Sequence, residues 1–155
     1  MGELTETDQQ AITEIAEYPA RISASIEAYR FREALNEMMN LARLGNKYLT
    51  ETEPWKNFAT NPERVKTNLN ISLQICANLS ILCEPFLPFT SGKLTGMLNM
   101  GLLEWSKAGS VELLPAGHNL NAPAFLFERI EDDAIAAQIK KLNDTKAEHA
   151  AENRV

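Results

Sequence analysis

The residues of this 155-residue sequence best suited to chemistry are Pro54 and Trp55, which follow a long helical pattern. Proline fixes its own φ and restricts the residue before it, so a Pro-Trp step just beyond a helix end holds a large planar ring at a defined point. Such a ring has two uses. It fills a core, since tryptophan is mostly buried, or it stacks on an unpaired base, as in much recognition of single-stranded RNA. The residues alone leave both interpretations open.

The histidines and cysteines form no recognisable catalytic or metal-binding set. His118 and His149 lack the spacing of metal ligands, and Cys76 and Cys83 lie seven positions apart on one face of a predicted helix. That separation is too great for a disulfide within a helix, so we interpret both cysteines as reduced core residues. The sequence also contains no glycine-rich phosphate loop after a strand and no nucleophile in a recognisable setting. We therefore predict no metal site and no catalytic residue in this chain.

The balance of charge limits the kind of partner. The net charge of −6 argues against a surface that grips nucleic acid throughout. Residues 43–66 differ from the acid-rich first and last thirds of the chain. There the basic residues outnumber the acidic ones: Arg43, Lys47, Lys56, Arg64 and Lys66 against Glu51, Glu53 and Glu63. The Pro-Trp step thus lies in the least acidic part of the chain, which leaves room for a local nucleic-acid site.

Helical periodicity indicates the elements that must position these residues. Thr5 and Asp8 have the form of a capping box, and the apolar stripe after them keeps its phase across Pro19, which predicts one helix, kinked or briefly broken there. Asn61-Pro62-Glu63 has the form of a helix start, and the helix after it is apolar on most sides, so we expect it to be central. The predicted helices cover residues 5–29, 31–50, 61–84, 90–99 and 131–142. This is an all-α fold, a helical bundle of about five helices.

Some buried contacts are also predicted. Gly45 lies on the apolar stripe of the second helix and would let another helix approach closely, while Gln74 and Asn78 in the central helix need hydrogen-bond partners if they face inward. Trp105 is interpreted as a core residue because apolar residues surround it. The stripe of the second helix consists of Leu35, Met38, Met39, Leu41, Ala42, Gly45, Tyr48 and Leu49.

Length and composition are those of one soluble globular domain, with 45% hydrophobic and 23% charged residues. We assign residues 1–142 to this domain and the polar residues 143–155 to a tail or linker. The acidic start lacks the apolar region of a secretory signal, and no apolar run approaches the ~20 residues of a membrane span. We therefore expect a cytoplasmic monomer without membrane contact.

Several motifs, in one order along the chain, resemble a known family. They are Phe31-Arg32-Glu33-Ala34-Leu35, Asn46-Lys47-Tyr48-Leu49, Glu53-Pro54-Trp55, Pro85-Phe86-Leu87-Pro88, Pro115-Ala116-Gly117-His118-Asn119-Leu120 and Arg129-Ile130-Glu131. Together they closely resemble the anticodon-binding helical domain of methionyl-tRNA synthetases, which are class I aminoacyl-tRNA synthetases. No single motif is specific, but their colinear sum covers nearly the whole chain. The Glu53-Pro54-Trp55 match disfavours the related domains of the valine and isoleucine enzymes.

The resemblance implies a parent ligase that attaches methionine to tRNA(Met) in protein biosynthesis, using ATP with magnesium, and with zinc as a further cofactor to consider. The chain lacks both active-site signatures of the family, His-Ile-Gly-His-like and Lys-Met-Ser-Lys-Ser-like. The resemblance therefore implies a piece that is not catalytic and holds no cofactor of its own. Its implied partners are the anticodon loop of tRNA(Met) and the parent catalytic domain. The sequence is also expected to begin after the first helix of the family's anticodon domain.

Trp55 is the position that matches an anticodon reader of the family. The resemblance implies that Trp55, held by Pro54, stacks on or buttresses an unstacked base of the CAU anticodon loop. Proximity in sequence makes Lys47, Lys56, Arg64 and Lys66 candidates for phosphate contacts, with solvated surface charges as the alternative. For the whole chain, the alternative function is a protein-interaction or scaffolding helical bundle without RNA binding, which the net charge and the missing helix favour.

Overall fold

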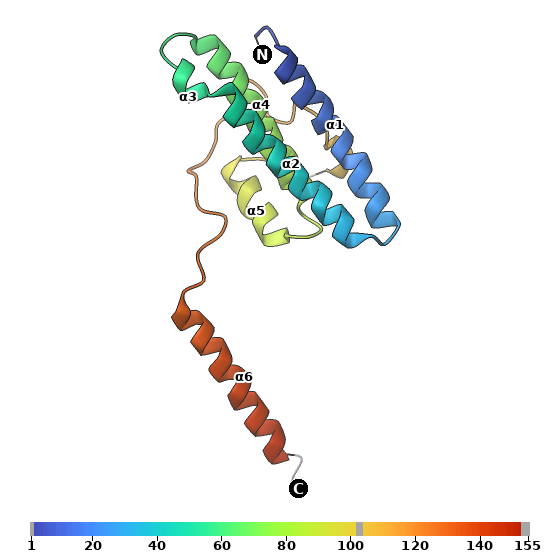
Figure 1. Cartoon of the computed structure of the whole chain (residues 1–155), viewed down its shortest axis with the longest axis vertical. Coiled ribbons are helices and arrows are strands. Elements are labelled where there is room, and N and C mark those ends of the chain that lie inside the picture. Colours follow the sequence, from blue (N-terminus) through green and yellow to red (C-terminus); the bar gives the residue numbers. More distant parts are fainter. Residues whose placement is uncertain (1, 102–103, 153–155) are drawn as a thin grey trace. The chain divides into compact units, whose positions relative to one another are not determined.

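The computed structural model describes residues 2–101 and 104–152, with side chains as far as residue 146. Five of its helices have ten residues or more, and no strand occurs in the described ranges. The predicted all-α fold with about five helices is therefore confirmed. The elements in Figure 1 are α1 (Glu6–Glu27), α2 (Phe31–Thr52), the single-turn α3 (Pro54–Asn57), α4 (Pro62–Leu82), α5 (Pro88–Met97), a short 3-10 helix (Trp105–Lys107) and α6 (Asp132–Glu152).

The chain forms two compact units, one ending at Ala124 and the other beginning at Phe125. The first unit, called the bundle below, holds α1 to α5 and the 3-10 helix. The second unit holds α6, which follows residues 125–131 without regular secondary structure. The assignment of residues 1–142 to a single domain stays a prediction.

The last helix is longer than the sequence analysis predicts. The predicted end near Leu142 is wrong, because α6 continues to Glu152. Residues 143–152 lack an apolar stripe, but several of them are alanine, lysine or glutamate, which are strong helix formers. Intrinsic propensity therefore extends the helix where periodicity gives no signal. Residues 153–155 of the predicted tail lie outside the described residues.

The helix α1 begins where the sequence predicts. The Thr5 backbone N–H donates to the Asp8 carboxylate at 2.8 Å, and the Asp8 N–H donates to the Thr5 hydroxyl oxygen at 3.4 Å, which completes the capping box. Acidic side chains in this first turn suit the positive end of the helix dipole. Pro19 lies within α1 without ending it, so the prediction of one helix is confirmed.

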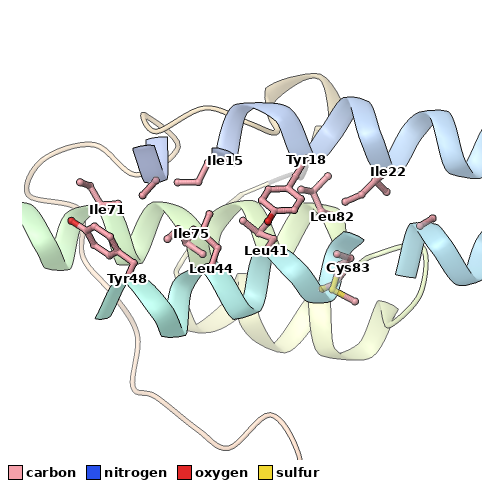
Figure 2. Packing of buried hydrophobic residues seen from close by; sticks show 13 residues of the cluster. Ile15, Tyr18, Ile22, Leu41, Leu44, Tyr48, Ile71, Ile75, Leu82 and Cys83 are labelled. Atoms are coloured by element: carbon pink, nitrogen blue, oxygen red, sulfur yellow. The ribbon is translucent and has the colours of Figure 1, made fainter. Parts of the chain in front are cut away.

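The core of the bundle lies between α1, α2 and α4, which pack side by side (Figure 1). The helix α4 contacts α1, α2, α3 and α5, as expected for the predicted central helix. Figure 2 shows Tyr48 and Ile71 at one end of the packed cluster, and Ile22 and Cys83, a free cysteine, toward the other. The buried cluster consists of Ala11, Ile15, Tyr18, Ile22, Ala34, Met38, Leu41, Leu44, Tyr48, Ile71, Ile75, Leu82 and Cys83.

The predicted apolar stripe of α2 is too wide. Leu41 and Tyr48 are buried as predicted, whereas Leu35 and Met39 are exposed. Leu44, which the prediction omits, is buried. The neighbouring helices cover a narrower arc of α2 than its apolar residues occupy, and apolar residues outside that arc stay on the surface.

Close contacts within the bundle agree with two further predictions. A Cβ atom added to Gly45 would lie 3.1 Å from Ile75 Cγ2, so α2 and α4 approach closely at this glycine. The buried Gln74 side chain donates to the Leu114 carbonyl oxygen at 2.8 Å and accepts from the Leu114 N–H at 3.2 Å. The inward-facing amide therefore has the partners that its burial requires.

Further side-chain hydrogen bonds join the segment after α5 to α4 and α1. The Asn78 side chain accepts from the Gly109 N–H at 2.5 Å and donates to the Ser110 carbonyl oxygen at 2.8 Å. The Trp105 indole N–H donates to the Ser23 hydroxyl at 3.0 Å, and its ring packs half-buried against the core. The core position predicted for Trp105 is thus confirmed in part, at the edge of the cluster.

Candidate nucleic-acid interface

The connector between α2 and α4, residues 53–61, carries the Pro-Trp step. Glu53 ends α2 and precedes α3 with φ 39° and ψ 56°, in the left-handed region. Pro54 takes the first position of α3, which suits its fixed φ and its missing N–H. The Pro54 side chain is buried. The chain therefore turns sharply at Glu53 and is anchored at the next residue.

The Trp55 ring lies on the surface of this turn. Trp55 is 62% exposed, so its interpretation as a core residue is wrong. The single helical turn that contains Trp55, α3, lies at the end of the bundle where α1 begins (Figure 1), and the buried Pro54 before Trp55 anchors its backbone. An exposed ring on a fixed backbone is the geometry on which an unpaired base can stack.

Phe58 follows α3, and its sequence context predicts no role for it. Phe58 is 72% exposed, so the connector presents two aromatic rings within four residues. Periodicity could not predict the exposure of Phe58, because a single aromatic residue in a connector belongs to no apolar repeat. The sequence does contain one signal of its exposure: Phe58 lies in a polar connector, three positions after Trp55.

Three of the four predicted phosphate contacts are exposed lysines. Ion pairs of exposed groups are worth about 0–1 kcal/mol, so a phosphate can replace the carboxylate of such a pair at little cost. The structure therefore leaves these lysines able to meet a phosphate. Their ammonium groups lie 3.9, 2.7 and 2.6 Å from carboxylates on neighbouring turns, in the pairs Lys47 with Glu51, Lys56 with Glu53 and Lys66 with Glu63.

The fourth candidate, Arg64, lies in a different setting. Its Nη2 donates to Asp8 Oδ1 at 2.7 Å and its Nη1 donates to the other oxygen of the same carboxylate. Only 19% of the Arg64 side chain is exposed. The Arg64 guanidinium is thus paired with a carboxylate inside the bundle, and we do not propose a phosphate contact for it. Proximity in sequence could not show that the first turn of α4 faces α1.

The Asp8 carboxylate is fully buried and receives donors from three helices or their caps. Besides the Arg64 guanidinium, the Tyr48 hydroxyl donates to Oδ1 at 2.6 Å, and the Thr5 N–H and hydroxyl donate to Oδ2 at 2.8 and 3.0 Å. We call Thr5, Asp8, Tyr48 and Arg64 the Asp8 network. The capping pattern predicts the Thr5 contact, whereas Tyr48 and Arg64 are distant in sequence and no pattern predicts their contacts with Asp8.

The charges within the Asp8 network shift its titration. Burial raises the pKa of Asp8, but the hydrogen bonds from Arg64, Tyr48 and Thr5 outweigh burial and hold this pKa well below its usual range. Burial and the hydrogen bond to Asp8 raise the pKa of Tyr48 above its ordinary value. At neutral pH the network therefore consists of a carboxylate, a guanidinium and a neutral phenol.

His118, Cys76 and Cys83 have side chains that the structure describes. The His118 ring nitrogen Nε2 lies 2.7 Å from the Leu98 carbonyl oxygen, and Cys76 and Cys83 are free. His149 lies beyond the described side chains. In residues 2–101 and 104–146, no three His, Cys, Asp or Glu side chains gather as a metal site requires. Within the part of the chain that the structure describes, no helix is both long enough and apolar enough to cross a membrane.

Comparisons with known proteins point to one family. A family model described as the anticodon binding domain of methionyl tRNA ligase matches residues 1–147. The methionine–tRNA ligase of Cytophaga hutchinsonii is 58% identical over 94% of the chain, and that of Bacteroides fragilis is 54% identical over 94%. The chain spans 21% of the length of each of these relatives.

A solved structure agrees with the architecture. The apo form of Mycobacterium tuberculosis methionyl-tRNA synthetase has a TM-score of 0.69 and 19% sequence identity, over 84% of this chain and 27% of that chain. At this identity the likeness concerns the fold alone, and it supports the predicted type of helical bundle. The family model matches residues 1–147, and the curated relatives are 54–58% identical over 94% of the chain. These matches show that the chain belongs to the family of anticodon-binding domains of methionyl-tRNA ligases.

Proposed function

We propose that this chain is the anticodon-recognition part of a methionine–tRNA ligase and that Trp55 stacks on an unpaired base of the CAU anticodon loop of tRNA(Met). The observation that carries the proposal is the 62% exposure of a tryptophan directly after a buried proline at a sharp turn. Because the Trp55 ring is exposed, it contributes little to packing of the bundle core. Base stacking uses such a ring, and membership of a family of anticodon-binding domains supports this use.

The lysines supply the second component of the interface. Lys56 directly follows Trp55, while Lys47 lies in the last turns of α2 and Lys66 in the second turn of α4. Their ammonium groups contact the anticodon-loop phosphates and give up their weak ion pairs to do so. Phosphate contacts fix the register of the RNA, and the ring contact reads an unpaired base.

The chemistry of the parent ligase lies outside this chain. The parent activates methionine with ATP and magnesium in its catalytic domain and transfers it to tRNA(Met), while the present chain acts as a non-catalytic monomeric part that binds the anticodon. The predicted site residues of this chain are accordingly binding residues: Trp55 and Pro54, with Lys47, Lys56 and Lys66.

Substitution of the ring tests the proposal. We expect Trp55→Ala to weaken binding of a CAU anticodon stem-loop about 5- to 150-fold, because stacking is worth about 1–3 kcal/mol per base. Fluorescence anisotropy of a labelled stem-loop measures the affinity. Phe89→Ala is the matched control, since Phe89 is 88% exposed but lies on α5, away from the connector. Equal affinities for Trp55→Ala and the unmodified chain would overturn the proposal.

A second function, a protein-interaction or scaffolding bundle, is favoured by the net charge of −6 and by the carboxylate partner of each lysine. Salt separates the two functions. Phosphate contacts release counterions, so RNA affinity falls as salt rises from about 50 to 200 mM. We expect this fall for the stem-loop. RNA affinity too weak to measure at either salt concentration would favour the scaffold.

A further inference from the structure

One buried carboxylate, that of Asp8, accepts hydrogen bonds from both helices that flank the connector carrying Trp55. Tyr48 lies in the last turns of α2, before the connector, and Arg64 lies in the first turn of α4, after it. The Tyr48 hydroxyl and Arg64 Nη2 both donate to Asp8 Oδ1, at 2.6 and 2.7 Å. Asp8 comes from α1, so a third helix holds together the two helices from which the connector starts and ends.

The connector is also closed by its own hydrogen bonds. The Thr52 hydroxyl donates to the Tyr48 carbonyl oxygen at 2.8 Å, and the Asn57 side chain donates to the Thr52 carbonyl oxygen at 3.4 Å. The Asn61 N–H donates to the Asn57 carbonyl oxygen at 2.9 Å, and the Asn61 side chain accepts from the Arg64 N–H at 3.1 Å. These contacts connect Tyr48 to Arg64 through the connector, and the hydrogen bonds of both residues to Asp8 close the series.

We propose that Asp8, Tyr48 and Arg64 are positioning residues for Trp55, and this inference rests on the proposed function. The Trp55 side chain is exposed, so its position depends on the backbone of the connector more than on packing of the ring. A backbone fixed at both ends presents the ring already ordered, and less conformational entropy is lost when a base stacks on it. Loosening one end of the connector therefore weakens RNA binding without touching the RNA.

The test uses Tyr48→Phe, which removes one hydroxyl and keeps the buried ring in the core. We expect it to weaken binding of the CAU stem-loop about 2- to 10-fold, the effect of one hydrogen bond. Ser80→Ala is the matched control. It also removes one fully buried hydroxyl, which donates to the Ala77 carbonyl oxygen within α4. We expect Ser80→Ala to change stability but not RNA affinity.

A double-mutant cycle separates positioning from a merely structural role. Both variants are compared in the unmodified chain and in the Trp55→Ala background, at a temperature where circular dichroism shows each chain folded. The proposal predicts that the Tyr48→Phe loss disappears in the Trp55→Ala background, because no ring remains to be positioned. Arg64→Lys, which keeps the charge but loses the two-pronged contact, is a second variant with the same expected behaviour.

Three outcomes overturn the inference. Tyr48→Phe and Arg64→Lys bind the stem-loop as tightly as the unmodified chain, or their losses persist unchanged in the Trp55→Ala background, or Ser80→Ala weakens binding equally. In each of these cases Trp55→Ala by itself still weakens binding, so the proposed function stands. If Trp55→Ala alone leaves the affinity unchanged, the proposed function has failed and this inference fails with it.

Discussion

In the whole ligase, Trp55→Ala is expected to lower the efficiency of tRNA charging, kcat/KM for tRNA, about 5- to 150-fold. The proposed stacking contact between Trp55 and an anticodon base is worth about 1–3 kcal/mol, so its removal weakens tRNA binding in the transition state for transfer. Formation of the methionyl adenylate requires no tRNA, so we expect its rate to stay unchanged.

Two assays on the same enzyme preparation check this result. Aminoacylation of tRNA(Met) measures charging, and methionine-dependent exchange between ATP and pyrophosphate measures adenylate formation. Phe89→Ala, which removes an exposed ring from α5, is expected to leave both unchanged. If the Trp55→Ala enzyme charges tRNA at the unmodified rate, the Trp55 ring is a surface residue that does not contact the RNA. An equal loss in both assays would mean that the variant disturbs the catalytic domain.

Removal of the buried carboxylate is expected to cost the most stability. Asp8→Ala leaves the Arg64 guanidinium without its carboxylate and the Tyr48 hydroxyl with only Asn68 Oδ1, at 3.5 Å, as an acceptor. Breaking a buried ion pair costs about 3–5 kcal/mol. Urea unfolding measures the free energy of unfolding. Glu17→Ala is the control, because the Glu17 pair with Arg21 is about half exposed on both sides, and we expect a loss below about 1 kcal/mol. Equal losses for the two variants would contradict the account.

The pH dependence of this effect has a defined sign. The pKa of Asp8 in the folded chain lies below its ordinary value of 3.8, so the unfolded chain binds the proton more tightly. The stabilisation by ionised Asp8 is therefore complete above about pH 4 and is lost as pH falls below that value. We expect the stability difference between the unmodified chain and Asp8→Asn to be constant from about pH 5 to 8 and to shrink below about pH 4. A difference that is the same at pH 3 and pH 7 would contradict the expectation.

Much of the fold could be predicted because its signals act over a few residues. The capping box of Thr5 and Asp8, and the proline at the first position of α4, are local features, and they mark helix starts that the structure confirms. The end of α6 could not be predicted in this way. Helix propensity decides it, since residues 143–152 contain no apolar repeat.

The candidate site was predictable only as far as Trp55. Its exposure depends on how α2, α3 and α4 meet, and the sequence therefore left a core position open as an alternative. The partner of Arg64 was out of reach for the same reason: Asp8 and Arg64 lie 56 positions apart, and no repeat connects them. Proximity in sequence thus made Arg64 a candidate for a phosphate contact, and it could not show that the guanidinium is hydrogen-bonded to Asp8.

The central claim, that the Trp55 ring meets an anticodon base, is tested most directly by the fluorescence of the two tryptophans, Trp55 and Trp105. A CAU anticodon stem-loop is titrated into the unmodified chain, Trp105→Phe and Trp55→Phe at low and moderate salt. We predict quenching in the unmodified chain and in Trp105→Phe, and its loss in Trp55→Phe. In the proposed complex the exposed Trp55 ring stacks on the RNA, whereas Trp105 is half-buried at the edge of the core. Binding of the stem-loop with the same quenching in Trp55→Phe as in the unmodified chain would contradict the account.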